Sequence, residues 1–448
     1  MEKVFLIHGW SATETTTYQA LHLQLAQHGF DLHHIYLGRY VSLDDAVEVS
    51  DIAHAMDQAL LEQLGKPPWT GRLHMITHST GALVVKQWLT DYYSGPRAEK
   101  RPLKNILFLA APHFGSRLAH HGRAMVSRVL ITRGPSGKRI LNALELGSAH
   151  SWAANGTLLA ADGWLGKGIR PFCLAGDRVP RDLFKSRIFP AAFETGSDGV
   201  VRVPAANLNF RRYRLDAGTR RFRKLGAVTG VPFAALERYV HSDVEHGIMN
   251  SITTQADVRK PAYQNLKLML ECLRVRNSAD YTRLQGRLSR VTQTTRKKRR
   301  AFAQLDLWFH DETGAPIDDY VWELGVYVDG RERPSKTIAH THKNTIDGSR
   351  FTVFLDLGHF EPDSAYFMRI STASGTPLYH YHPGEFTVQL SGRQLLDIIS
   401  ADQTTQVEVV FGRRAHSRLF RFHRGDDEDL HVSWDREGEI TKSGIPPK

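Results

Sequence analysis

Ser79 lies in a sequence context that suits a nucleophilic serine. The run Thr77-His78-Ser79-Thr80-Gly81 falls between an apolar, strand-like segment at residues 73–76 and a helix-like segment at residues 82–92. A sharp strand-to-helix turn of this kind lifts the serine Oγ above a sheet, and small neighbouring residues allow the tight approach. The run departs from the pattern Gly-x-Ser-x-Gly, because Thr77 takes the place of the first glycine. The alternative is an ordinary turn in which Ser79 caps the helix.

A second motif could stabilise the oxyanion that attack by a serine creates. Ile7-His8-Gly9-Trp10 ends the first apolar run of the chain. In folds with such a serine turn, the loop after an early strand and the residue after the serine each supply a backbone N–H. We therefore expect Trp10 and Thr80 to form the oxyanion hole. A strand-ending turn without a further role is the alternative for His8-Gly9.

A carboxylate should follow the serine in the chain, near the end of a later strand. Two residues qualify, and we favour Asp198, which lies in the loop Gly196-Ser197-Asp198-Gly199. Asp177 follows the strand-like run at residues 169–176, but it adjoins Arg178, so an ion pair or a turn accounts for it. For Asp198, the competing interpretation is an Asp-Gly turn.

Two histidines, His241 and His246, follow in the order that a general base requires. We favour His246, because Gly247 and an apolar pair come after it, could begin a helix, and would leave the ring on a loop above the sheet. The chain contains 23 histidines, so only order and context distinguish one of them. In the expected mechanism His246 takes the Ser79 proton, Asp198 orients the imidazole, and water hydrolyses an acyl-enzyme. This mechanism needs no metal and no other cofactor.

Strands and helices alternate over the first 115 residues. Apolar runs at 4–7, 73–76 and 105–110 alternate with segments of helical spacing. Such alternation predicts an α/β domain with a mostly parallel sheet. We place this domain at residues 1–275.

Residues 115–168 break the alternation and are expected to form a lid or cap insertion over one edge of the sheet. Trp152, Trp164 and Leu165 in this insertion either form an apolar lid that faces lipid or pack inside the protein.

Four motifs together resemble those of α/β-hydrolase lipases: Val4-Phe5-Leu6-Ile7-His8-Gly9, the run around Ser79, Pro112-His113-Phe114-Gly115-Ser116 and Ser197-Asp198-Gly199-Val200-Val201. They are similar to bacterial lipases and phospholipases of the GPI-inositol-deacylase and lecithin–cholesterol acyltransferase branch. The resemblance covers about residues 1 to 273. It implies a Ser-Asp-His carboxylester hydrolase that acts on acyl lipids, with Asp198 as the acid and His246 as the base.

The C-terminal part of the chain has a different pattern. Residues 276–303 are rich in Lys and Arg and are expected to form a basic linker. Short alternating runs separated by turn signals, at residues 304–424, predict an all-β sandwich domain. Residues 425–448 are expected to form a polar tail. The sandwich could dock on a membrane or bind a delivery protein or an inhibitor, on fold-level analogy alone.

Composition limits the classes of protein that this chain can represent. Its 448 residues contain two cysteines, which excludes a disulfide framework. No run of apolar residues is long enough to span a membrane, and no secretory signal peptide is visible. We therefore expect a protein that is cytoplasmic in the producing cell, or one exported by a signal-independent system. An antibacterial effector of a type VI machine, with an immunity protein as partner, fits the second case.

The net charge of +11 is concentrated in three clusters, at residues 211–214, 220–224 and 296–300. They favour an anionic membrane surface as partner, since each Lys or Arg near such a surface contributes about 1 kcal/mol. The clusters do not favour nucleic acid, because no aromatic platform or recognisable binding module accompanies the charge. Two other functions stay open: a general esterase or acyltransferase for soluble acyl esters, and an inactive hydrolase scaffold that binds membrane or nucleic acid.

Overall fold

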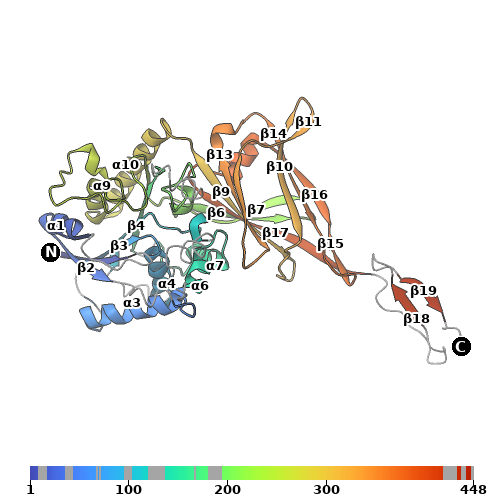
Figure 1. Cartoon of the computed structure of the whole chain (residues 1–448), viewed down its shortest axis with the longest axis horizontal. Coiled ribbons are helices and arrows are strands. Elements are labelled where there is room, and N and C mark those ends of the chain that lie inside the picture. Colours follow the sequence, from blue (N-terminus) through green and yellow to red (C-terminus); the bar gives the residue numbers. More distant parts are fainter. Residues whose placement is uncertain are drawn as a thin grey trace, which may run out of the picture.

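The computed structural model describes residues 1–8, 18–35, 44–66, 69, 72–94, 103–119, 137–165, 168–179, 194–416, 431–434 and 440–444. Figure 1 shows two parts: an α/β part built mainly from the N-terminal half, and an all-β part built mainly from the C-terminal half. This arrangement confirms the expected fold class. Within the described residues, no helix is both long and apolar enough to cross a membrane.

A six-stranded parallel sheet forms the centre of the α/β part, in the order β2-β1-β3-β4-β5-β8. Both faces of the sheet are covered, so its inner strands contain runs of consecutive apolar residues, such as those at 4–7 and 106–109. The strands are β1 (Glu2–Ile7), β2 (Phe30–Ile35), β3 (Leu73–His78), β4 (Leu103–Leu109), β5 (Arg170–Gly176) and β8 (Phe233–Leu236).

Helices cover the two faces of this sheet. In β1, Phe5 and Ile7 point to one face, while Val4 and Leu6 point to the other, as the two-residue period of a strand requires. The first face packs against α3 (Val49–Leu64) and α4 (Gly81–Tyr93), with α6 (Lys138–Leu144) and α7 (Ala149–Leu159) nearby. The second face packs against α1 (Gln19–Gln27), α9 (Gln264–Leu273) and α10 (Ser278–Arg296). Two short 3₁₀ helices, η4 (Pro204–Ala206) and η5 (Pro261–Tyr263), lie in the connections.

The segment expected as a basic linker contains helix α10, which packs on the α/β part. Leu284 and Leu288 are buried against the second face. Thr292 accepts a hydrogen bond from the Ala235 N–H, and Thr295 donates one to the Ala235 carbonyl, so the helix covers the edge strand β8. The linker interpretation of this stretch is therefore wrong. Its apolar stripe has helical spacing, but basic side chains on the other faces of the helix obscure that stripe in the composition.

Two further sheets form the all-β part. One has the order β12-β13-β9-β17-β6-β7, with β15 paired to β17, and the other has the order β11-β10-β14-β16. Their facing side chains share one core. The bounds are β9 (Phe302–Asp311), β10 (Tyr320–Val328), β11 (Arg331–Pro334), β12 (Ile338–Lys343), β13 (Arg350–Asp356), β14 (Ala365–Thr372), β15 (Tyr379–His382), β16 (Glu385–Ser391) and β17 (Thr404–Ala415), with η6 (Leu357–His359) and α11 (Gly392–Ile398) between strands.

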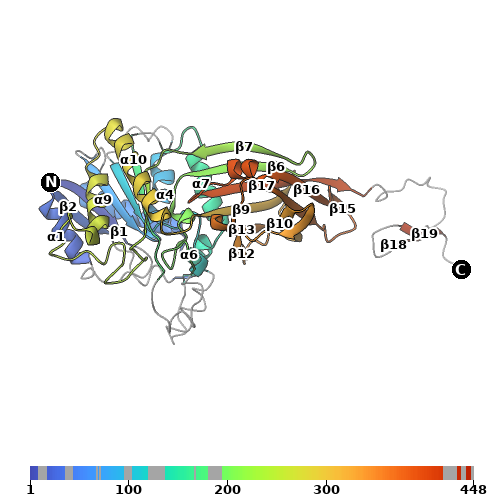
Figure 2. The same ribbon diagram turned by 90° about the horizontal axis from the view of Figure 1, so that it is seen from above.

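A hairpin from the first half of the chain completes the larger of these sheets. It consists of β6 (Phe210–Asp216) and β7 (Arg221–Val228), and β6 pairs in parallel with β17. Figure 2 shows the hairpin extending along the all-β part. The sequence boundary near residue 275 therefore does not separate the two parts in space.

Three other expectations differ from the structure or fall partly outside the described residues. The tail expected at 425–448 contains two short strands, β18 (His431–Trp434) and β19 (Ile440–Gly444), which pair with each other. Within the insertion, Trp152 and Trp164 are buried rather than exposed as a lipid-facing lid would need. Trp152 packs against Trp308 of β9, with ring centroids 5.8 Å apart. Residues 120–136 of the insertion and the strand-like run at 418–422 lie outside the described residues.

Candidate active site

Ser79 occupies a strained turn between β3 and α4. Its φ angle is +54°, a left-handed conformation that L-residues other than Asn and Asp rarely adopt. The Ser79 N–H donates to the Leu109 carbonyl at the end of β4, which fixes the turn over the carboxyl edge of the sheet. Gly81 allows this close approach, since a Cβ there would lie 2.5 Å from the Ile7 carbonyl oxygen.

A histidine and an aspartate complete a hydrogen-bonded row with this serine. His241 Nε2 lies 3.0 Å from Ser79 Oγ, and His241 Nδ1 lies 3.0 Å from Asp198 Oδ2. An ionised carboxylate only accepts hydrogen bonds, so Asp198 keeps the proton on Nδ1 and leaves Nε2 as the acceptor for the serine hydroxyl. This is the arrangement that makes a serine nucleophilic.

The structure corrects the choice between the two histidines. His246 does not reach Ser79; its ring is about one third exposed and lies 3.6 Å from the Glu245 carboxylate. The residues after His246 form a turn whose Ile248 and Met249 enter the core, rather than a helix below a catalytic loop. A signal for His241 was present in the sequence, because the apolar run of β8 ends five residues before it. A base at the end of the last strand matches the expected chain order.

Asp198 is held by its own loop. Its Oδ1 accepts hydrogen bonds from the N–H groups of Val200 and Val201, at 2.9 and 2.7 Å, and its carbonyl accepts one from the His241 N–H. Gly176, the last residue of β5, lies directly beneath, and a Cβ there would come within 2.9 Å of the Asp198 Cβ.

Asp177 takes a structural role instead. Its carboxylate accepts a hydrogen bond from Arg296 at the end of α10, and Arg296 also pairs with Asp402 of the all-β part at 2.7 Å. Asp177 is therefore committed to an ion pair with Arg296.

His78 is a site residue that sequence reasoning missed. Its Nε2–H donates to the His241 carbonyl at 3.2 Å, and the two rings lie 4.9 Å apart. Burial, together with the neighbouring His241, lowers the pKa of His78 to about 3, so its ring is neutral at physiological pH. A neutral donor below His241 supports the position of that residue without adding a second positive charge.

Of the two expected oxyanion donors, the structure describes Thr80. Its N–H follows Ser79 at the start of α4, where the first amides of a helix have no intrahelical partner and can bind an anion. Trp10 lies outside the described residues. Within the described part of the chain, no three His, Cys, Asp or Glu side chains gather as metal ligands would.

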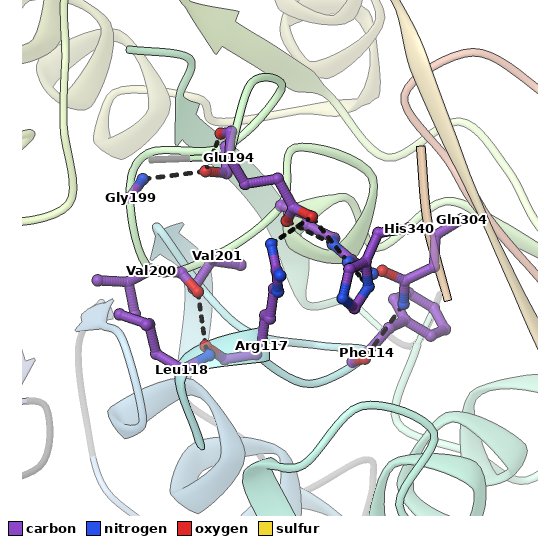
Figure 3. Close-up of polar contacts among 12 residues, drawn as sticks. Phe114, Arg117, Leu118, Glu194, Gly199, Val200, Val201, Gln304 and His340 are labelled. Atoms are coloured by element: carbon purple, nitrogen blue, oxygen red, sulfur yellow. Dashed lines mark hydrogen bonds and ion pairs between the residues drawn. The ribbon is translucent and has the colours of Figure 1, made fainter. Parts of the chain in front are cut away.

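The motif at residues 112–116 contacts the loop that carries Asp198. The Ser116 hydroxyl donates to the Val200 carbonyl, two residues after the acid (Figure 3). Phe114 is buried and stacks edge-on against Phe210 of β6. The motif thus joins the serine-bearing sheet to the acid loop and to the all-β part.

The parallel sheet, the strained serine turn and the order Ser79, Asp198, His241 together decide the fold. The α/β part has the α/β-hydrolase fold. No family model matches the chain, and no curated protein matches it in sequence.

Solved structures give a match over the full length of this chain. The phospholipase PlaB from Legionella pneumophila shares 26% identity with a TM-score of 0.83, and the alignment covers 99% of this chain and 100% of that one. The same phospholipase in complex with thio-NAD gives 27% identity and a TM-score of 0.82, with the same coverage. The mature lipase BlEst2 from Bacillus licheniformis matches 46% of this chain and 78% of its own, with 18% identity and a TM-score of 0.33.

Proposed function

We propose that this protein is a serine-dependent lipase or phospholipase that cleaves acyl esters of lipids through an acyl-enzyme on Ser79. The hydrogen-bonded row from Ser79 through His241 to Asp198 carries this proposal. The substrate class is supported by the similarity to a bacterial phospholipase over the whole chain, including the all-β part.

The geometry supports a sequence of proton transfers. Nε2 of His241 takes the Ser79 proton as Oγ attacks the ester carbonyl, and the Thr80 N–H donates to the oxyanion that forms. The imidazolium then returns the proton to the leaving alcohol, which leaves an acyl group on Ser79. Water, activated by the same Nε2, releases the fatty acid and restores the serine. Asp198 stabilises the imidazolium in both halves of the reaction.

Product analysis tests this function directly. Wild-type protein with mixed phospholipid vesicles should release free fatty acid and lysophospholipid, detected by mass spectrometry. Ser79→Ala should lose this activity by about 10³-fold or more, because the nucleophile is gone. The matched control is Ser289→Ala, an exposed serine on α10, which should retain full activity.

Two outcomes would favour the other functions. Turnover of soluble short-chain esters without any increase at micelles would indicate a general esterase or an acyltransferase. No turnover of any acyl ester by the wild type, or full turnover by Ser79→Ala, would leave the inactive scaffold as the better description.

We further propose an anionic membrane surface as the partner, and the distribution of unpaired cationic side chains supports one place on the protein for it. Two of the three basic clusters are largely occupied by partners within the protein. In the first, Arg214 pairs with Glu408, and Arg212 hydrogen-bonds to Gln406. In the third, Arg296 and Arg300 both pair with aspartates. Neither cluster is therefore a free cationic surface.

A groove elsewhere on the protein presents more positive charge to solvent than these two clusters do. It lies between α10 and the segment that leads into α9, has a volume of about 470 Å³, and contains six cationic side chains: Arg238, Arg259, Lys260, Lys267, Arg287 and Arg290. Glu237, its one acidic lining residue, pairs with Lys298. Arg259 and Arg287 have acidic partners, whereas the other four cations form no salt bridge among the described residues.

The groove lies at the edge of the sheet that carries the active site. Arg238 follows the carboxyl end of β8 by two residues and precedes His241 by three. β8 lies three strands from β3 in the sheet, which is about 14 Å at the usual spacing of strands. A bilayer whose phosphates contact this groove would therefore lie close to Ser79.

Vesicle sedimentation separates this groove from the exposed β6–β7 hairpin. Reversing two groove charges, Lys260→Glu with Arg290→Glu, should weaken binding to vesicles that contain phosphatidylglycerol by about tenfold or more. The matched control reverses Arg220 and Arg223 on the hairpin, which should change binding little. Phosphatidylcholine vesicles measure binding in the absence of anionic lipid. Turnover of a soluble ester shows whether each variant keeps its chemistry. A loss confined to the hairpin variant, or no loss in either, would contradict the groove as the docking surface.

Membership of the GPI-inositol-deacylase and lecithin–cholesterol acyltransferase branch stays a prediction. The same holds for a cytoplasmic location, for signal-independent export as an effector, and for an immunity or delivery partner. Fractionation of the producing cell and its medium would test the location.

A further inference from the structure

A partly buried cluster of ionisable side chains lies beside the loop that carries Asp198. The Glu194 carboxylate binds Arg202 through two hydrogen bonds, at 2.8 and 3.0 Å, and Arg117 through one at 3.2 Å. Arg202 also donates to Nδ1 of His340 at 3.0 Å. We name these four residues the acid-loop clamp; Figure 3 shows Arg117 and His340 on either side of the contacts to Glu194. The proposed proton transfers use none of them.

Arg202 couples the clamp to the acid. It forms an antiparallel bridge with Ser197, the residue before Asp198, so the two residues close the loop at its base. Its side chain is 1% exposed, and its guanidinium lies 4.3 Å from the centre of the Phe354 ring. A guanidinium fixed by a bidentate carboxylate and a ring face has little freedom to move.

Glu194 and His340 each have the charge state that their contacts with Arg202 require. Burial opposes ionisation of Glu194, but Arg202 and Arg117 outweigh it and hold the pKa of Glu194 below its ordinary value. Burial and the two arginines lower the pKa of His340 to about 4, so its ring is neutral at physiological pH. A neutral imidazole offers Nδ1 as an acceptor to Arg202, whereas an imidazolium would repel it.

The all-β part supplies the floor of the acid loop. His340 belongs to β12, Phe354 to β13 and Phe302 to β9, and the two phenylalanine rings stack 4.7 Å apart. Phe302 lies directly against Gly196, where a Cβ would come within 2.3 Å of the ring. Gly196 also has a φ of +80°, so the loop needs glycine there for its conformation as well as for space.

We infer that Arg202, held between Glu194 and His340, is a positioning residue for Asp198, and that the all-β part thereby completes the active site. This inference rests on the proposed function, since it assigns a purpose to the position of Asp198. The contacts run from His340 to Arg202, from Arg202 to the Ser197 bridge, and from there to the carboxylate that holds His241. The all-β part is then a component of the catalytic unit rather than a separate docking module.

Substitution of His340 tests the inference and removes little buried volume from the rest of the protein. His340→Ala removes the acceptor that the all-β part offers to Arg202. We expect kcat on p-nitrophenyl butyrate to fall about 10- to 100-fold with KM unchanged, since small misplacements of catalytic groups cost this much. The acidic limb of the kcat/KM profile should also move to lower pH, because a displaced Asp198 stabilises the His241 imidazolium less.

A rescue variant and two controls make the result decisive. His340→Asn keeps an acceptor near the position of Nδ1 and should recover most of the activity and the original pH profile. Arg300→Met removes an ion pair with Asp356 between the end of α10 and β13, and should alter stability without altering kcat or the pH profile. Ser79→Ala, assayed in parallel, reports whether the proposed function holds.

Each outcome has one meaning. An inactive Ser79→Ala together with normal kcat and pH profile in His340→Ala would overturn the positioning role and leave the function intact. The same holds if His340→Ala and Arg300→Met change kcat equally, because the effect would then be one of stability. An active Ser79→Ala would overturn the function itself.

Discussion

Ser79 stores conformational strain at the point where the chemistry takes place. A left-handed φ at a residue with a Cβ costs about 1–3 kcal/mol, and it persists only where the surroundings enforce it. Here β3 on one side and the buried helix α4 on the other enforce it, with Gly81 packed against the end of β1. The strain holds Oγ at the end of the strand, toward His241, without any contribution from bound substrate.

Lys86 is another residue whose environment opposes its ordinary state. It lies on α4, fully buried, and donates to Asn155 Oδ1 at 2.6 Å; Asn155 in turn donates to the His113 carbonyl. Burial lowers the pKa of Lys86 to about 7 from the ordinary 10.5. The amine therefore loses its proton far more readily in the folded protein than in the unfolded chain.

The consequence is a stability that depends on alkaline pH. Between pH 7 and 10.5 the unfolded chain binds a proton at Lys86 that the folded protein does not, so the free energy of unfolding should rise with pH in this window. Lys86→Met should flatten this rise, whereas Lys297→Met, an exposed lysine after α10, should not. Urea unfolding across the window measures both. A rise that is unchanged in Lys86→Met would show that the lysine is not the cause.

At the scale of single residues, the sequence was informative where the signal is local. The serine turn is recognisable because a sharp turn needs small residues at fixed spacing around Ser79. Asp198 stands out because glycines on either side mark a tight loop. The choice between His241 and His246 as the base required knowing where a short edge strand ends. The four-residue run of β8 was not identified as a strand. His78 could not be predicted, since its role depends on a contact with a residue 163 positions away.

Among the elements, α10 shows how composition can mislead. Its apolar residues occupy one stripe, and the charge surrounding that stripe reads as a solvated linker. In the structure this stripe covers the second face of the sheet. Thr292 and Thr295 form hydrogen bonds with the backbone of the edge strand β8. The charge remains on the outer face, where Arg287 and Arg290 line the cationic groove.

The β6–β7 hairpin shows a different limit. Strand-like alternation at residues 210–228 says nothing about which sheet the strands join, because β6 finds its parallel partner β17 almost 200 residues later. Such pairing is set by tertiary packing: Leu215 and Ala217 enter the core of the all-β part. The order of elements in the chain therefore predicted the two fold types but not the border between them.

For the whole molecule, the border between the two parts is rich in polar contacts. The acid-loop clamp is one of them, the Asp177–Arg296–Asp402 chain is a second, and Glu145, which binds His342 and Thr345, is a third. Much of the arginine that raises the net charge is thus used inside the protein. The groove beside α10 therefore indicates an anionic partner more directly than the net charge of +11 does.

The central claim is that Ser79, His241 and Asp198 act as one catalytic row, and paired histidine variants test it most directly. The measurement is kcat/KM on p-nitrophenyl butyrate for His241→Ala and His246→Ala. His241→Ala should lose about 10³-fold or more, because no other base reaches Ser79 Oγ among the described residues. His246→Ala should stay within about twofold of the wild type, as expected for a side chain outside the row. Full activity in His241→Ala, or a large loss in His246→Ala alone, would contradict the account.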